Sequence, residues 1–82
     1  MGPTKGAPAA SPETMTVHAI GAAAGKIWHV LHQHGGHVRL TNVRREVAMP
    51  ESLVYMALGW LAREGKLDLR QQGRVIYVGL KP

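Results

Sequence analysis

The spacing of hydrophobic residues changes from helical to alternating at Gly65. Before this glycine, apolar side chains recur at three- and four-residue intervals, which predicts a helix over 50–64 with one buried face. After it, apolar and polar residues alternate over 66–71 and again over 74–80, which is typical of strands. Because Gly73 lies in the short turn between the strands, we expect an antiparallel hairpin. Its apolar side is predicted to hold Leu67, Leu69, Ile76, Val78 and Leu80.

A longer helical pattern covers residues 17–34. The side chain of Thr16 can cap its first turn, and Gly35 ends it. Gly21 and Gly25 lie within the helix, where each costs about 1 kcal/mol relative to alanine. We therefore expect another helix to approach closely at these two positions. The buried stripe is predicted to consist of Ile20, Ala23, Ala24, Ile27, Trp28 and Leu31.

The chain between these helices predicts a brief extended piece over 37–40 and a short helix over 41–48, capped by Thr41. Pro50 cannot continue that helix but suits the first position of the next, whose positive end Glu51 complements. The inward residues of this third helix are predicted to be Val54, Ala57, Leu58 and Leu61. The resulting order predicts a winged helix-turn-helix domain, an α+β and mainly α fold with three helices and a C-terminal β-hairpin wing.

Two strings carry a resemblance to a known family. Residues 20–28 (IGAAAGKIW) and 55–66 (YMALGWLAREGK) resemble a small bacterial and archaeal winged helix-turn-helix family of unknown function. The resemblance spans residues 17–80. It implies the winged-helix fold, and it implies DNA binding by analogy with bacterial transcription regulators, because one fold serves many functions.

The composition indicates one small domain over 16–82, preceded by a tail over 1–15. The tail holds three of the five prolines and little that a core could bury, so we expect it to be disordered. Met15 is a second candidate for the translation start. The chain has no cysteine, which excludes disulfides and thiolate zinc sites. The sequence contains neither a secretory signal nor a membrane span, and we expect a cytoplasmic protein with no membrane association.

Duplex DNA is the favoured partner. Ten Lys and Arg against five Asp and Glu give a net charge of +5, which attracts phosphate polymers. The third helix exposes few side chains that hydrogen-bond base edges well, so contacts with phosphates are expected to supply most of the affinity. An ordinary solvated surface is the alternative interpretation of the arginines. The candidate DNA-binding residues are Arg44, Arg45, Ser52, Tyr55, Arg63, Arg70, Gln71, Gln72 and Arg74.

A protein-protein interaction or dimerisation surface on the third helix is the alternative function. Tyr55, Met56 and Trp60 fall on one side of this helix, away from its buried stripe. Aromatic residues and methionine are enriched in interfaces. For Trp60 a second interpretation stays open, in which the wing folds back over the indole and makes it a core residue.

Metal binding and catalysis are not expected. His29, His32, His34 and His37 are close in sequence, but no cysteine or neighbouring carboxylate completes a tetrahedral ligand set. These histidines are expected to complement the negative end of the first helix. No nucleophile motif or phosphate-binding glycine loop occurs, and we expect no pocket of ordinary ligand size. The sequence therefore predicts no cofactor, no small-molecule substrate and no enzymatic activity.

The tail prediction can be tested by deletion. Removing residues 1–14 should leave the thermal midpoint almost unchanged, because these residues offer nothing to bury. Calorimetry of the full and shortened chains checks this. A drop of several degrees would mean that the tail packs on the domain.

Overall fold

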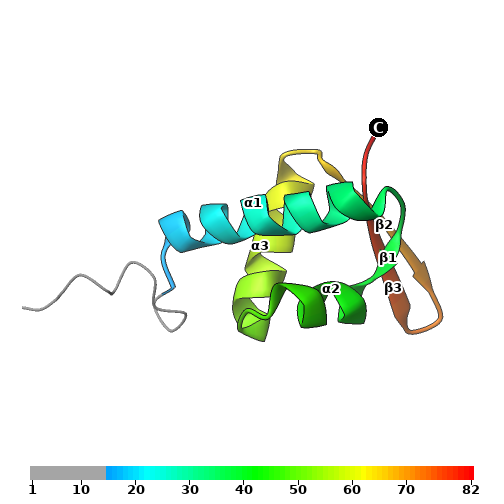
Figure 1. The fold of residues 1–82 in the computed structure, drawn as a ribbon, viewed down its shortest axis with the longest axis horizontal. Helices are drawn as coiled ribbons and strands as arrows, with labels where there is room; N and C mark the ends of the chain where they lie inside the picture. The colour runs from blue at the N-terminus through cyan, green and yellow to red at the C-terminus, as the bar shows by residue number, and fades with distance from the viewer. Residues whose placement is uncertain (1–14) are drawn as a thin grey trace, which may run out of the picture.

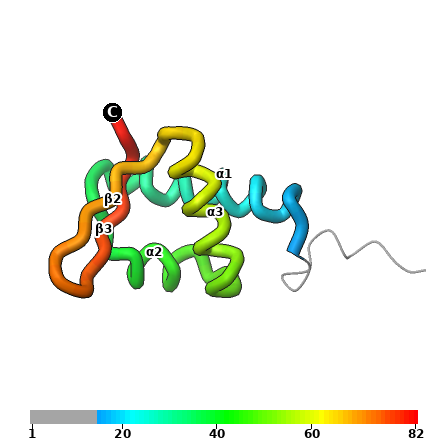
Figure 2. The backbone as a smooth tube through the Cα atoms, turned by 180° about the vertical axis from the view of Figure 1, so that it is seen from behind, coloured from blue at the N-terminus to red at the C-terminus, as the bar shows by residue number. Residues whose placement is uncertain are grey.

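The computed structural model describes residues 15–82, so the predicted tail lies outside the described residues except for Met15. Three helices lie against one end of a small sheet (Figures 1 and 2). The elements are α1 (Val17–His34), β1 (Val38–Arg39), α2 (Leu40–Val47), α3 (Glu51–Arg63), β2 (Leu67–Gln72) and β3 (Val75–Leu80). Their kinds and order confirm the prediction of three helices, a short strand and a C-terminal hairpin.

The ends of α1 form as the sequence predicts. The Thr16 hydroxyl accepts a hydrogen bond from the Ala19 amide at 2.9 Å, which satisfies one of the free donors of the first turn. Gly35 adopts a left-handed conformation with φ 73°, and its amide donates to the Leu31 carbonyl. The capped helix presents one apolar stripe to the rest of the domain.

The core forms where α1 crosses α3. Its small residues allow a close approach, and the Trp60 indole of α3 lies 3.5 Å from where a Cβ on Gly21 would stand. The sequence predicted a close approach of another helix at Gly25 as well. That prediction is wrong, because no atom of another element lies within 4 Å of where a Cβ on Gly25 would stand. Trp28 is half-buried at the rim of the core, where a fully buried position was expected. The buried residues are Ala23, Ala24, Ile27, Leu31, Val43, Leu53, Val54, Ala57, Leu58, Leu61, Leu67 and Val78.

The helix-turn-helix segment begins earlier than predicted. Arg39, with extended backbone, is the N-cap of α2 and makes no side-chain capping bond, so the predicted Thr41 cap is wrong. The reason is that Leu40 already packs against the core in a helical conformation. Ala48 ends α2 in a left-handed conformation with φ 52°. Pro50 then stands at the N-cap of α3 instead of at its first helical position.

The sheet is antiparallel in the order β1-β3-β2, so β3 is the central strand. Val38 of β1 pairs with Val78, and the hairpin is in register from Leu67 opposite Leu80 to the turn at Gly73. The expectation that Leu69 is covered by the core is wrong, because its side chain is 54% exposed. At Leu69, strand β2 extends beyond the helices, whereas the opposite residue of β3 still lies between β1 and β2.

The core assignment predicts a large stability loss for Ile27→Ala. Ile27 is fully buried between the helices, and truncating such a side chain costs about 2–5 kcal/mol through lost burial and the cavity left behind. Val17→Ala is the matched control in α1, because Val17 is 70% exposed. Urea unfolding measures both variants, and equal stabilities would contradict the described face of α1.

Candidate nucleic-acid interface

A cleft of about 300 Å³ opens where α2, α3 and the hairpin meet. It brings together three of the predicted DNA-binding residues, each from a different part of the fold. Arg44 comes from α2, Tyr55 from α3 and Arg74 from the turn before β3. The cleft is lined by Arg39, Leu40, Thr41, Arg44, Tyr55, Arg74, Val75 and Ile76. Several guanidinium groups around one opening raise the local positive potential.

Arg39 was missed by the sequence analysis. It pairs with Tyr77 across the sheet and then leads directly into α2, which places it at the cleft. The usable signal was the alternation around it, since Val38 and Leu40 are both apolar and partly buried while Arg39 between them is exposed. A cation immediately before a helix-turn-helix segment is therefore a candidate phosphate ligand.

Arg44, Glu51 and Tyr55 form a small network at the start of α3. The Arg44 guanidinium lies 3.0 Å from Oε2 of Glu51, and the Tyr55 hydroxyl donates to the same oxygen at 3.0 Å. The guanidinium also stands 5.7 Å from the centre of the Tyr55 ring. These groups are solvent-accessible, and an exposed ion pair contributes only about 0–1 kcal/mol. A phosphate can therefore compete with Glu51 for Arg44.

Arg45 lies beside this cleft. It lines a neighbouring hollow of about 340 Å³ together with Arg44 and Glu51. Arg45 is exposed and has no ion-pair partner among residues 15–82. Arg44 thus lines both hollows, whereas Arg45 lines only the second.

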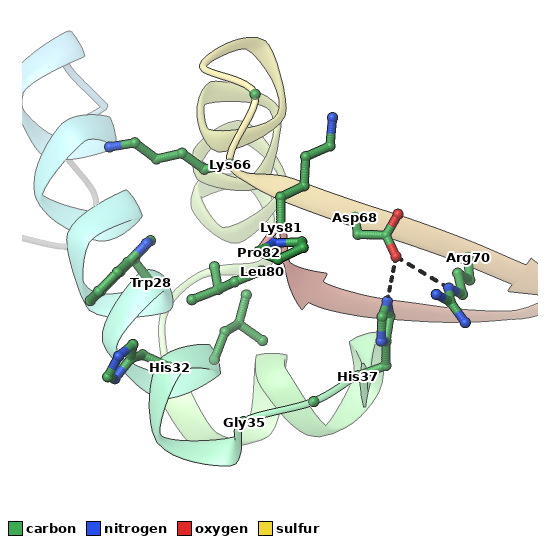
Figure 3. Close-up of a pocket in the computed structure, with 13 residues that line it drawn as sticks. Trp28, His32, Gly35, His37, Lys66, Asp68, Arg70, Leu80, Lys81 and Pro82 are labelled. Atoms are coloured by element: carbon green, nitrogen blue, oxygen red, sulfur yellow. Dashed lines mark hydrogen bonds and ion pairs between the residues drawn. The ribbon is translucent and has the colours of Figure 1, made fainter.

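The wing residues have several different roles. Arg70 donates to Oδ2 of Asp68 at 3.2 Å, and Nε2 of His37 lies 2.7 Å from the same oxygen (Figure 3). The hydrogen bond from His37, with the Arg70 guanidinium beside it, holds the pKa of the Asp68 carboxyl below its ordinary value. The Gln71 amide donates to the Gly73 carbonyl at 3.0 Å and so braces the turn. Gln72 is exposed beside that turn.

The α3 candidates are spread along the helix. Ser52 is exposed in the first turn, whereas Arg63 is exposed in the last. Eleven residues of helix separate them by roughly 16 Å. Neither lines the cleft.

The exposed apolar surface of α3 is smaller than the three predicted residues suggest. Tyr55 is 44% exposed and Met56 50% exposed. Trp60 is half-buried, which agrees with the core interpretation of this residue. Its cover differs from the expected one, because α1 packs on the indole at Gly21 in place of the wing.

The four clustered histidines do not gather at one site. His32 stacks on Trp28 with ring centroids 4.8 Å apart, and His29 meets the edge of the same indole. His34 lies 2.9 Å from Glu46 of α2, and His37 contacts Asp68. Among residues 15–82 no three potential metal ligands converge. His34 thus connects α1 to α2 and His37 connects the following loop to β2, whereas His29 and His32 pack within α1.

An open groove of about 920 Å³ lies between the end of α1 and the hairpin (Figure 3). The expectation that the chain is too small for such a volume is wrong, since ligand pockets hold about 300–1,000 Å³. The groove arises because the sheet stands beyond the end of the helices. Its lining includes Trp28, His32, His37, Lys66, Asp68 and Leu80.

Comparisons with known proteins identify the fold family. Residues 15–80 match the family model described as "Winged helix-turn-helix domain (DUF2582)". This chain belongs to that family. One relative is the uncharacterized protein MJ1608 of Methanocaldococcus jannaschii. It is 37% identical to this chain over 65 residues, which cover 76% of this chain and 90% of the relative. The winged helix-turn-helix chain is also similar to the solution NMR structure of BT2368 from Bacteroides thetaiotaomicron, with a TM-score of 0.70, 30% identity, and coverage of 80% and 79% of the two chains.

No helix of this family member, over the part the structure describes, is long and apolar enough to cross a membrane.

The lowered pKa of Asp68 predicts a specific pH dependence. A carboxyl group whose pKa is depressed on folding stabilises the fold above its unfolded value of 3.8, and this contribution is lost as the pH falls through the folded value. Asp68→Asn should therefore flatten the acid side of the stability profile below about pH 4. Thermal unfolding over a pH series measures the effect. Glu64→Gln, another exposed carboxyl beside a cation, is the control, and an equal flattening by both would refute the role of Asp68.

Proposed function

We propose that this winged helix-turn-helix domain binds duplex DNA, with affinity that comes mainly from phosphate contacts. The supporting observation is the cleft between α2, α3 and the hairpin, where Arg39, Arg44 and Arg74 converge. These residues are far apart in sequence, and only the folded domain gathers them. A duplex supplies the matching feature, a regular row of phosphates.

The expected docking places α3 toward the major groove and the wing along the sugar-phosphate backbone. Arg44 and Arg45 would then contact one stretch of backbone from α2, and Arg74 another from the wing. Glu51 accepts hydrogen bonds from Arg44 and Tyr55, which limits the repulsion that its carboxylate exerts on an approaching phosphate. The site therefore has more cationic character than the position of Glu51 alone would indicate.

Low sequence selectivity follows from the same surface. Ser52, Tyr55 and Met56 form the exposed face near the start of α3, and none is among the residues that bond two atoms of one base edge. Binding through phosphates positions the domain without selecting a sequence. A role in transcription regulation, in the cytoplasm, agrees with such a DNA-binding module.

We also propose that the domain is a binding module without catalytic activity. The hydroxyl of Tyr55 and the imidazoles of His34 and His37 are each engaged with a carboxylate in a partly exposed position. A histidine base activates a nucleophile only when a hydroxyl or thiol lies within hydrogen-bond distance of it, and over residues 15–82 the side-chain hydrogen bonds of these two imidazoles go to carboxylates alone.

The cleft predicts which charges matter for DNA. Arg44→Ala with Arg74→Ala should weaken binding to all duplex sequences alike and reduce the slope of log K against log salt by up to about two, because each lost phosphate contact removes about 0.9. Fluorescence anisotropy of the full chain with mixed-sequence duplexes at several salt concentrations measures this.

Lys26→Ala with Lys81→Ala is the matched control. It removes the same charge from exposed positions that do not line the cleft. A slope that falls equally in both double variants would show a general charge effect and contradict the cleft. Salt-insensitive binding by the unaltered chain would contradict the whole proposal.

Protein interaction through α3 is the second candidate. Tyr55 and Met56 are adjacent and about half exposed, and apolar anchors of this kind carry much of an interface's energy. If this function is correct, Tyr55→Ala with Met56→Ala abolishes capture of the partner while the arginine variants leave it intact.

A further inference from the structure

Strand β2 is an edge strand whose outer side carries no neighbour in the described part of the chain. The sheet order places β3 on one side of it only. Its pairing with β3 is unbroken from Leu67 to Gln72, so it has no bulge, and it contains neither proline nor lysine. A bulge, a proline or a lysine usually protects an edge strand from pairing with another strand, and β2 has none of the three.

The hydrogen-bond pattern identifies which backbone groups point outward. The Lys81 amide donates to the Lys66 carbonyl at 3.0 Å, so these two residues form a hydrogen-bonded antiparallel pair. Such pairs alternate along an antiparallel ladder. Asp68, Arg70 and Gln72 therefore direct their backbone groups toward β3. The outward groups belong to Leu67, Leu69 and Gln71.

Leu69 is the centre of this free edge and its largest exposed apolar side chain. It stands on the face of the sheet that Leu67 and Val78 occupy, yet it is 54% exposed because the helices do not reach it. On the opposite face, Asp68 and Arg70 lie side by side on β2 with opposite charges (Figure 3). An apolar centre between an acid and a base is self-complementary under a two-fold rotation.

We propose that a second copy of this chain pairs with β2 in antiparallel register, centred on Leu69. Leu69 then opposes the partner's Leu69, and Leu67 opposes the partner's Gln71, through the outward backbone groups. Asp68 opposes the partner's Arg70 at both symmetric positions. These pairs are the non-hydrogen-bonded ones, whose side chains are closest, so opposite charges gain most there. The two sheets become one continuous six-stranded sheet.

Charge selects this register over its neighbours. Shifting the centre to Asp68 places the two Asp68 carboxylates opposite each other, and shifting it to Arg70 does the same for the two guanidinium groups. Like charges directly opposite destabilise a strand pair. A second copy is favoured over an unrelated peptide because the complementary charges are already present on β2 itself. One strand pair with an exposed rim gives a small interface, so the dimer is reversible.

Charge reversal tests the register. Asp68→Arg and Arg70→Asp each create like-charge pairs, and each should weaken self-association at least about tenfold. An equal mixture of the two variants should associate, because one then presents two cations and the other two anions. The double exchange, with both changes in one chain, should restore self-association. Analytical ultracentrifugation of the full chains measures all four samples, and circular dichroism checks that each is folded.

A second measurement uses the unaltered chain and does not depend on the variants. Hydrogen exchange followed by NMR should show amides of Leu67, Leu69 and Gln71 that become protected as protein concentration rises. Asp68, Arg70 and Gln72 amides should be protected at every concentration, since they bond to β3. A chain that stays monomeric at millimolar concentration, or protection that does not change at the three outward amides, overturns the proposal.

Leu69→Lys and Met56→Lys form the matched pair of surface variants, since these side chains are 54% and 50% exposed on different elements. Loss of the dimer with Leu69→Lys alone supports the β2 edge. Loss with Met56→Lys alone moves self-association to α3 and refutes the proposed interface. Failure of this proposal and failure of the DNA-binding proposal can be distinguished. Fluorescence anisotropy with duplex DNA tests the arginines of the cleft, whereas ultracentrifugation and hydrogen exchange test self-association through β2.

Discussion

The contact between α1 and α3 is the constraint on which the rest of the domain depends. Ala23 and Ala24 on one helix and Ala57 on the other are buried, and Gly21 leaves room for the Trp60 indole. Small side chains let helix axes approach, whereas larger ones would force them apart at a cost in close packing. The α2 helix and the sheet both pack on this helix pair through buried residues of the same core.

Charge over residues 15–82 is distributed unevenly. All four carboxylates among residues 15–82 have a cationic or imidazole neighbour, as Glu46 has His34, Glu51 has Arg44, Glu64 has Lys66 and Asp68 has both His37 and Arg70. The exposed arginines outside these pairs therefore dominate the surface field. Three of these pairs, those of Glu46 with His34, Glu51 with Arg44 and Asp68 with His37, connect separate segments of the fold. The same interactions that align α2 and β2 with their neighbours therefore leave Arg45 and Arg74 available to a polyanion.

Hydrophobic spacing was enough to predict the helices and the hairpin, because periods of 3.6 and 2 are local properties. It was not enough for Leu69, since an alternating pattern gives the face of a strand but not how far the helices extend beneath it. Thr41 failed as a cap because tertiary packing of Leu40 decided where α2 begins. The candidate site was predictable only as a set of cations. The network of Arg44 with Glu51 depends on the turn between α2 and α3, and the role of Arg39 depends on a strand pairing that is distant in sequence.

The pairing of Val38 with Val78 also has a kinetic consequence. The hairpin of β2 and β3 is local and can close within microseconds, as can the helices. Attaching β1 requires residues 40 positions apart in the sequence to meet, and such distant contacts incur their loop-closure entropy before they gain any burial. The contact of α1 with α3 is equally distant in sequence, but these two helices hold most of the buried residues, whereas the sheet contributes Leu67 and Val78. The wing should therefore join the helices late in folding and leave them early in unfolding. Partial opening of the native domain would then begin at the sheet, with α1 and α3 still packed together.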